Sequence, residues 1–95
     1  MAKILFVRCG DRFTNPDAEE TLTLPGTLGP QDIPEAVRQV RAAITGDTRL
    51  IVAGPGGLCF ALGMALEHIP QKVEFVQLNQ ATKAYEVWAS NAHNL

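Results

Sequence analysis

The chain has 95 residues, of which 46% are apolar, and its formal net charge at pH 7 is −2. These values predict one compact domain over residues 1–95, disfavour duplex nucleic acid as a partner, and leave so small a core that a partner subunit would help to stabilise it. The longest apolar run, residues 58–66, falls short of the roughly 20 residues of a membrane span, and the chain opens without the features of a signal peptide. We therefore expect a cytoplasmic protein that does not bind membranes.

The first half of the chain predicts two strands and one helix. Residues 3–7 are almost continuously apolar, which is typical of a strand buried on both faces in the middle of a parallel sheet. A polar loop follows, and residues 21–24 alternate as a short half-buried strand does. Asp32 and Glu35 fit the cap and third positions of a capping box, and Gly46 stands where helices often end in a left-handed residue. A helix with one buried face is expected between Asp32 and Gly46.

The second half predicts a strand, a glycine turn and a helix, followed by two more strands. A strand over 49–53 is broken by the sequence Gly54-Pro55-Gly56-Gly57, and a helix over 58–69 follows. The remaining elements are a strand over 73–78, an edge strand over 83–89 and an irregular tail over 91–95. The predicted fold is a minimal Rossmann-like α/β domain, with an about five-stranded, mostly parallel sheet, two main helices and a C-terminal strand pair.

The predicted helix 58–69 is apolar nearly all round. Its residues divide into a stripe that we expect to cover the sheet and a set that points elsewhere: Leu58, Leu62, Ala65 and Ile69 form the stripe, and Phe60, Gly63 and Met64 form the other set. A helix of this kind is normally covered on both sides. Closed two-fold dimers are the commonest assemblies, so we predict a homodimer with this helix in its interface.

The glycine turn at residues 54–58 is the strongest candidate for a functional site. Backbone N–H groups at the start of a helix favour phosphate oxygens, and glycine lets a ligand come close. Ligands of open α/β sheets bind where the loops after neighbouring strands meet. If the two strands are neighbours, an arginine of the first loop, Arg8 or Arg12, pairs with a phosphate that the glycine amides also hold. The alternative is that the glycines only make a tight turn and a close helix contact.

No nucleotide cofactor is expected, because the turn matches neither the dinucleotide fingerprint nor the Walker P-loop. The two cysteines are expected to be reduced; they lack the spacing of a zinc site, and no histidine near them in sequence would activate a thiolate. Tyr85 and Trp88 point to opposite faces of the last strand, so that one could stack on a base while the other packs. The predicted ligand-binding residues are Arg8, Cys9, Gly10, Asp11, Arg12, Gly54, Pro55, Gly56, Gly57, Leu58 and Asn79.

The order of these elements resembles a CARF or SAVED-type domain, the Rossmann-like sensors of cyclic oligonucleotides. The segment from Leu50 to Trp88 carries the resemblance: LIVAGPGGLCFALGMALEHIPQKVEFVQLN, followed by YEVW, is similar to small stand-alone CRISPR-associated proteins. The resemblance covers most of the chain.

The resemblance implies a homodimer that binds a cyclic oligoadenylate, cyclic tetra-adenylate first, in a pocket across the two-fold axis, and so modulates type III CRISPR signalling. Some members only hold the messenger as a sponge. Others are ring nucleases that cleave it without a metal, with a ribose 2′-hydroxyl as nucleophile. Arg8, Arg12 and Lys83 are then the candidates for stabilising the transition state. The alternative function is a structural or protein-binding domain with no nucleotide ligand.

Overall fold

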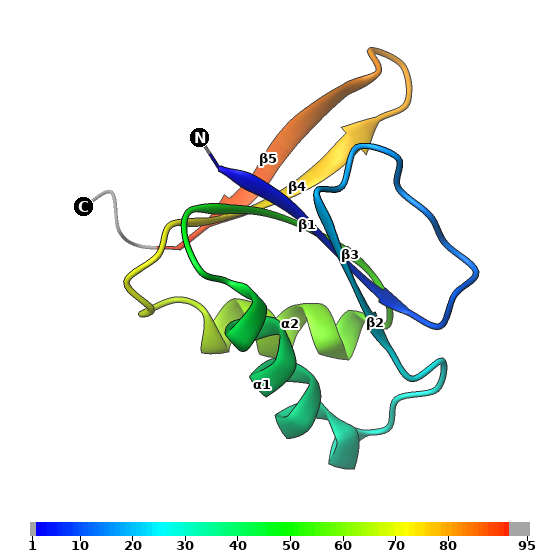
Figure 1. Ribbon diagram of the computed structural model, residues 1–95, viewed down its shortest axis with the longest axis vertical. Coiled ribbons are helices and arrows are strands. Elements are labelled where there is room, and N and C mark those ends of the chain that lie inside the picture. Colours follow the sequence, from blue (N-terminus) through cyan, green and yellow to red (C-terminus); the bar gives the residue numbers. More distant parts are fainter. Residues whose placement is uncertain (1, 92–95) are drawn as a thin grey trace.

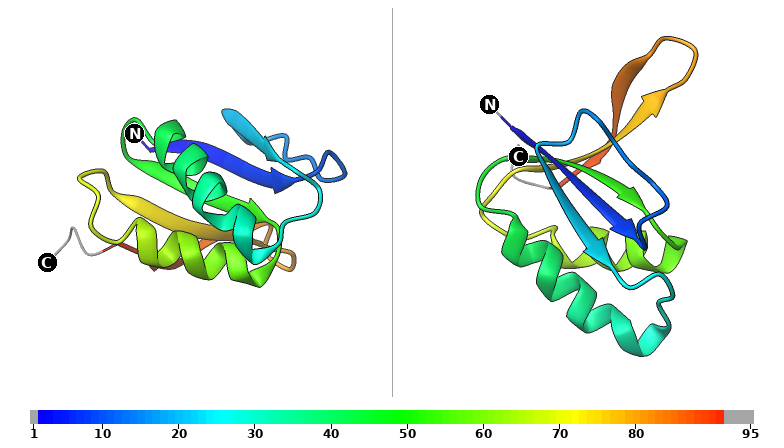
Figure 2. Two further views of the ribbon diagram at one scale, coloured as in Figure 1. Left: turned by 90° about the horizontal axis from the view of Figure 1, so that it is seen from below. Right: turned by 45° about the vertical axis from the view of Figure 1, so that its right-hand side comes forward.

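A five-stranded sheet carries two helices on one of its faces in the computed structural model, which describes residues 2–91 (Figures 1 and 2). The α/β class, the five strands and the two main helices confirm the predicted fold. Of the predicted tail, residues 92–95 lie outside the described part of the chain. The elements in chain order are β1 (Lys3–Cys9), β2 (Glu20–Leu24), the 3-10 turn η1 (Pro30–Asp32), α1 (Ile33–Ala43), β3 (Thr48–Ala53), α2 (Gly56–Ala65), β4 (Val73–Asn79) and β5 (Ala84–Ser90).

The strands are ordered β2-β1-β3-β4-β5, and only the β4–β5 pair is antiparallel. β1 therefore lies between two parallel neighbours, and both of its faces are buried, as its apolar run predicts. Leu5 and Val7 are fully buried in the core that the sheet shares with the helices, whereas Phe6 is 4% exposed and points to the other face.

The two faces of the sheet are covered by different parts of the chain. The crossovers through α1 and α2 advance along the sheet in the same direction, and right-handed crossovers of this kind place both helices on one face. The connection from β1 to β2, residues 10–19, advances in the opposite direction and lies on the other face (Figure 2). There the Tyr85 hydroxyl of β5 donates a hydrogen bond to the Asp17 carboxylate over 2.8 Å, which ties this loop to the sheet.

The ends of α1 differ from the prediction. Asp32 makes no side-chain cap for α1, because its carboxylate accepts a hydrogen bond from the backbone N–H of Gly29 over 2.8 Å and so closes the preceding 3-10 turn. Glu35 pairs with side chains of its own helix instead of completing a capping box. At the other end Ile44 is extended, and Gly46 has no positive φ. The helix has one buried face, as predicted, but the face is shifted: Val40 and the following Ile44 are buried with Ala36, whereas the expected Ile33 and Val37 are only partly buried.

α2 begins two residues before the predicted start and ends at Ala65, and the chain continues as a turn to the end of the predicted helix. The buried residues of α2 and of the turn after it are close to the predicted stripe and consist of Leu58, Leu62, Leu66 and Ile69. Ala65 is only partly buried, because Leu66 takes its place in the stripe. The stripe packs against β1, β3 and α1, and so fixes the position of the glycine turn.

The β4–β5 hairpin leaves the sheet after a short contact with β3. β3 and β4 pair over three residue pairs only, from Thr48↔Val73 to Leu50↔Phe75. Beyond that point the hairpin turns away from the helices (Figure 1). The same place carries a β-bulge between β4 and β5, and bulges increase the local twist and bend a strand. The separation opens a space between the ends of β3 and β4.

Candidate functional site

The carboxyl ends of β1 and β3 lie at the same edge of the sheet, as the predicted ligand site requires. The two strands are paired in register up to Arg8 and Ala53, so that Cys9 and Gly54 follow side by side. A Cβ atom on Gly54 would lie only 2.8 Å from Cys9 Sγ. The Cys9 thiol thus occupies the space that a side chain at position 54 would need, which explains why this residue is glycine. The packing explanation of the glycine turn holds at this one position.

Gly56 and Gly57, at the start of α2, have no such reason to be glycine. Both are exposed, and a Cβ atom added to either would meet nothing within 4 Å. Neither has a positive φ, because Gly10 is the only glycine in the described range 2–91 that does. Glycine near a helix end still costs stability relative to alanine. The chain therefore carries two adjacent glycines that its own packing and its own backbone geometry do not require.

The turn itself is held by the two residues that flank these glycines. Pro55 is extended, and its carbonyl accepts the N–H of Leu58 over 3.0 Å and that of Cys59 over 3.4 Å. Leu58 is fully buried and anchors the first turn of α2 in the core. The first N–H groups of a helix have no partner within it. Those of Gly56 and Gly57 consequently lie at the exposed, positive end of the helix dipole.

The loop after β1 brings further predicted residues to this edge. Gly10 has φ 79°, and its N–H donates to the Leu24 carbonyl over 2.9 Å, which explains the glycine by its left-handed conformation. Asp11 and Arg12 follow and are exposed. The Arg12 guanidinium lies over the Phe13 ring, 5.8 Å from its centre. Arg12 is therefore a cation at the surface of the loop that follows the strand next to the glycine turn.

Arg8 does not lie with the glycine amides. It alternates with Cys9 along β1, and Cys9 packs on the helix face, so the Arg8 side chain belongs to the opposite face. There its Nε donates to Thr23 Oγ1 over 2.8 Å and its NH1 donates to the Phe13 carbonyl over 2.9 Å. In this structure Arg8 orders the loop after β1, and phosphate binding by Arg8 at the glycine turn stays a prediction.

Asn79 ends β4 and Lys83 lies in the turn that leads to β5, at the tip of the hairpin that projects from the sheet (Figure 1). The Asn79 side-chain oxygen accepts the N–H groups of Ala81 and Thr82, over 2.9 and 3.2 Å. Lys83 has φ 59°, and its Nζ donates to Gln80 over 3.3 Å. Both side chains make contacts within the turn, and the structure does not bring them to the glycine turn.

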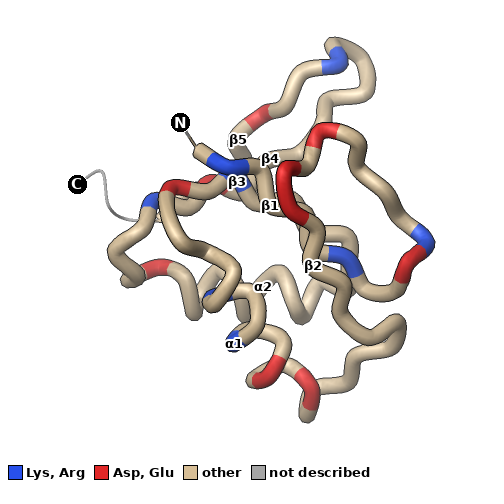
Figure 3. The backbone as a smooth tube through the Cα atoms, viewed as in Figure 1, with Lys and Arg blue, Asp and Glu red and all other residues tan. Residues whose placement is uncertain are grey.

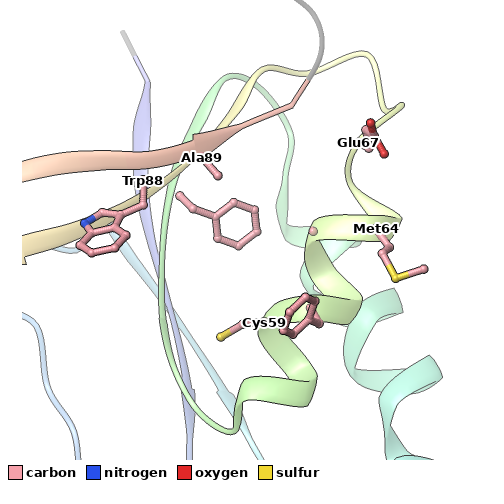
Figure 4. A pocket seen from close by; sticks show the side chains of 8 residues that line it. Cys59, Met64, Glu67, Trp88 and Ala89 are labelled. Carbon is pink, nitrogen blue, oxygen red and sulfur yellow. The ribbon is translucent and has the colours of Figure 1, made fainter.

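The structure has a groove between α2 and β5 that the sequence analysis did not predict. It holds a cavity of about 600 Å³ that is lined by Phe60, Met64, Phe75 and Trp88, among others. In Figure 4 Trp88 and Cys59 lie on opposite walls of this groove. Phe60 is 79% exposed, Met64 76% and Trp88 69%. The apolar repeat of α2 indicated an unpaired face, but no feature of the sequence indicated that β5 would form the second wall.

The environments of Cys9 and Tyr85 raise the pKa of both side chains. Burial raises the pKa of the Cys9 thiol, and the neighbouring Cys59 raises it further. Cys9 is then a neutral thiol near pH 7, which disfavours a role as nucleophile. Burial also raises the pKa of Tyr85, whose hydroxyl contacts Asp17 and Asn15. Tyr85 therefore holds the loop of residues 10–19, and Trp88 is the exposed aromatic side chain of the predicted pair.

Lysine and arginine side chains are spread over several elements and alternate with acidic ones, whereas α2 carries no charge (Figure 3). Within residues 2–91, no three His, Cys, Asp or Glu side chains gather as metal ligands. Neither helix of this part of the chain has the length and apolar content to cross a membrane.

Comparison of the chain with family models, with curated proteins and with solved structures gave no match in any of the three. The candidate site is therefore described by its own geometry: a glycine turn beside the loop after β1, and an apolar groove along α2.

Proposed function

We propose that this chain binds a cyclic oligoadenylate, cyclic tetra-adenylate first, in a pocket shared by two copies, and acts in the cytoplasm on type III CRISPR signalling. The observation that carries the proposal is the pair Gly56 and Gly57: neither the packing nor the backbone geometry of the described chain requires glycine at these positions. A ligand that approaches the backbone closely would require it. Because the positive end of a helix favours anions, that ligand is expected to carry phosphate groups.

The outer face of α2 supports the shared pocket. Phe60 and Met64 are more than three-quarters exposed, and between them Gly63 leaves room for a close approach. Covering this face with a second copy would remove a large apolar area from water. A two-fold axis roughly parallel to α2 keeps the N-termini of the two α2 helices at the same end of the dimer. Only with such an axis do both glycine turns face one ring. A ring with two-fold symmetry then contacts both turns.

Whether the ring is held or cleaved depends on groups that contact its phosphates. Of the three candidate cations, Arg12 is exposed in the loop after β1, whereas Arg8 is engaged with Thr23 and Lys83 lies at the hairpin tip. A ring nuclease of this kind needs orientation of the ribose 2′-hydroxyl and stabilisation of charge, so one cation from each copy is sufficient in principle. A sponge and a nuclease therefore share the same pocket.

The test is isothermal titration of the purified protein with cyclic tri-, tetra- and hexa-adenylate, followed by chromatography of the recovered ligand. We expect one ring per dimer, with cyclic tetra-adenylate bound most tightly. Intact ligand after hours indicates a sponge, and linear products indicate a nuclease. If none of the three rings binds, the proposal fails and the structural or protein-binding alternative, which the exposed face of α2 favours, takes its place.

A matched pair of variants locates the phosphate site. Gly56→Glu places a carboxylate at the glycine amides and should abolish binding by repelling phosphate, while an acidic residue in the first helical turn leaves the fold intact. Gly46→Glu is the control, because Gly46 is likewise exposed and has nothing within 4 Å of an added Cβ atom. Equal affinities of the two variants would remove the site from the glycine turn.

A further inference from the structure

A narrow second cavity lies between β3 and β4, where the hairpin leaves the sheet. Its volume is about 210 Å³, and it is lined by Leu50, Val52, Cys59, Phe75, Val76, Gln77 and Trp88. Sites for drug-sized ligands have roughly 300–1,000 Å³. This cavity is therefore suited to one ring system and not to a whole cyclic oligonucleotide. It shares the walls at Cys59, Phe75 and Trp88 with the larger groove along α2.

Trp88 lies at the bulge of β5, on the face that strand alternation predicts for it. Phe75 pairs with Ala89 and Val76 pairs with Val87, so Trp88 is the extra residue of β5 and has no partner on β4. The indole is 69% exposed although it is the largest apolar side chain in the protein, and it forms part of the cavity wall. A planar aromatic face is thus presented beside a space with room for another ring.

Polar groups line the same cavity. Gln77, on β4, is exposed and contributes a carboxamide to the lining. The pairing of β3 with β4 ends at Leu50↔Phe75, so the backbone edges of both strands beyond that pair face the cavity without a strand partner. Such edges supply hydrogen-bond donors and acceptors. The cavity therefore combines a stacking surface with groups that can read the edge of a heterocycle.

We infer that the cavity between β3 and β4 binds one adenine base of the ligand, stacked on Trp88 and hydrogen-bonded by Gln77. The inference rests on the proposed function and deepens it by naming the residues that recognise the base. Glutamine matches adenine because its carboxamide pairs with N6 and N7 at once. Stacking on an aromatic side chain adds affinity for any base.

The position of the cavity relative to the glycine turn supports an adenine nucleotide. Cys59 lines the cavity and lies three residues after Gly56, within the first turn of α2. One helical turn rises about 5.4 Å. One wall of the cavity therefore begins within one helical turn of the glycine amides, so the two sites are close enough to be contacted by one ligand. A second copy of the chain fits the wider groove at Phe60 and Met64 better than this narrow space.

Trp88 is the only tryptophan of the chain, so all indole fluorescence comes from the wall that this cavity shares with the groove along α2. The experiment measures indole fluorescence, calorimetric affinity and molar mass by light scattering, with cyclic tetra-adenylate, its guanine counterpart and adenosine monophosphate as probes. We expect the adenine ring to quench the indole as it binds. Trp88→Ala should weaken binding roughly 5- to 150-fold without changing the mass. Trp88→Phe should retain most of the affinity because a phenyl ring also stacks.

Val87→Ala is the matched control, since Val87 is the neighbouring residue of β5, is 50% exposed and does not line the cavity. It should bind like the natural protein. Gln77→Ala should reduce the preference for the adenine ring over the guanine ring by roughly 5- to 150-fold.

Three outcomes overturn the inference, and they differ in whether the proposed function is retained. If calorimetry shows that the ring binds but the indole fluorescence is not quenched, or if Trp88→Ala binds the ring with full affinity, the base lies elsewhere. The proposed function is then retained. A lower molar mass of Trp88→Ala, together with lost binding, assigns Trp88 to the contact between two copies. Absence of binding to every probe removes the proposed function and the base site together.

Discussion

The two helices cover the same face of the sheet, but their outer faces differ. α1 presents an ion pair between Glu35 and Arg38 to water, whereas α2 presents Phe60 and Met64. An amphipathic helix with a charged outer face is complete when its apolar stripe is buried, but an apolar outer face remains to be covered. Within one copy of the chain the surface of α1 is therefore complete, whereas α2 leaves an apolar face exposed to water.

The largest effect should separate the two faces of α2 itself. Leu62→Ala removes a fully buried side chain and should destabilise the protein by about 2–5 kcal/mol. Met64→Ala, on the outer face, should change the stability of a single copy by less than about 0.5 kcal/mol. Urea unfolding at a concentration where light scattering shows single copies measures both. Similar losses in the two variants would show that Met64 belongs to the core of one copy.

A charge on the outer face of either helix tests the second contact. Met64→Lys should raise the dissociation constant of the dimer by roughly 30-fold or more, because a residue central to an interface contributes about 2 kcal/mol or more. Ala42→Lys, at an exposed position of α1, should leave the dimer unchanged. Light scattering over a dilution series measures both constants. The interface would have to be sought elsewhere if Ala42→Lys, and not Met64→Lys, dissociated the dimer.

The glycines of the turn should respond differently to one added methyl group. Gly54→Ala forces a Cβ atom against Cys9 Sγ and should destabilise the protein by about 1–3 kcal/mol. Gly57→Ala meets open space and should stabilise the fold by up to about 1 kcal/mol while it weakens binding of the ring. Thermal unfolding and calorimetry measure the two effects.

The pair of substitutions Gly54→Ala and Cys9→Ala provides the check on the cause. Removing the Cys9 thiol should relieve part of the strain, so the double variant should be more stable than the sum of the single losses predicts. Strictly additive losses would show that the Cys9 thiol is not what excludes a side chain at Gly54.

Much of the fold was predictable because its signals are local. The apolar run of β1 and the buried stripe of α2 follow from the periods of strands and helices, which sequence alone displays. The rules for parallel sheets predicted that the loops after β1 and β3 meet if these strands are neighbours, and the structure pairs the two strands. The capping box around Asp32 failed because that carboxylate had a nearer donor in Gly29, which a spacing rule does not rank.

The missed parts of the site depend on relations between distant segments. Period-two alternation predicted that Tyr85 and Trp88 lie on opposite faces of β5, and in the structure Tyr85 contacts the loop of residues 10–19 while Trp88 lines the groove along α2. Alternation does not locate the bulge, which leaves Trp88 without a partner on β4. The side-chain partners of Arg8 come from β2 and from the loop after β1. Neither the cavity between β3 and β4 nor the second wall of the α2 groove is encoded within one segment.

The smallest effect concerns the ion pair that completes α1. Hydrogen bonds from Arg38 and Gln39 lower the pKa of Glu35 to about 2, compared with about 4.3 for an unperturbed glutamate. A lowered pKa stabilises the fold above the unfolded value, and this stability is lost as pH falls from about 4.3 through about 2. Because the pair is fully exposed, salt screening keeps the change small. Carbon NMR titration of Glu35 should show its midpoint return to the ordinary range in Arg38→Ala, and an ordinary midpoint in the natural protein would contradict the pairing.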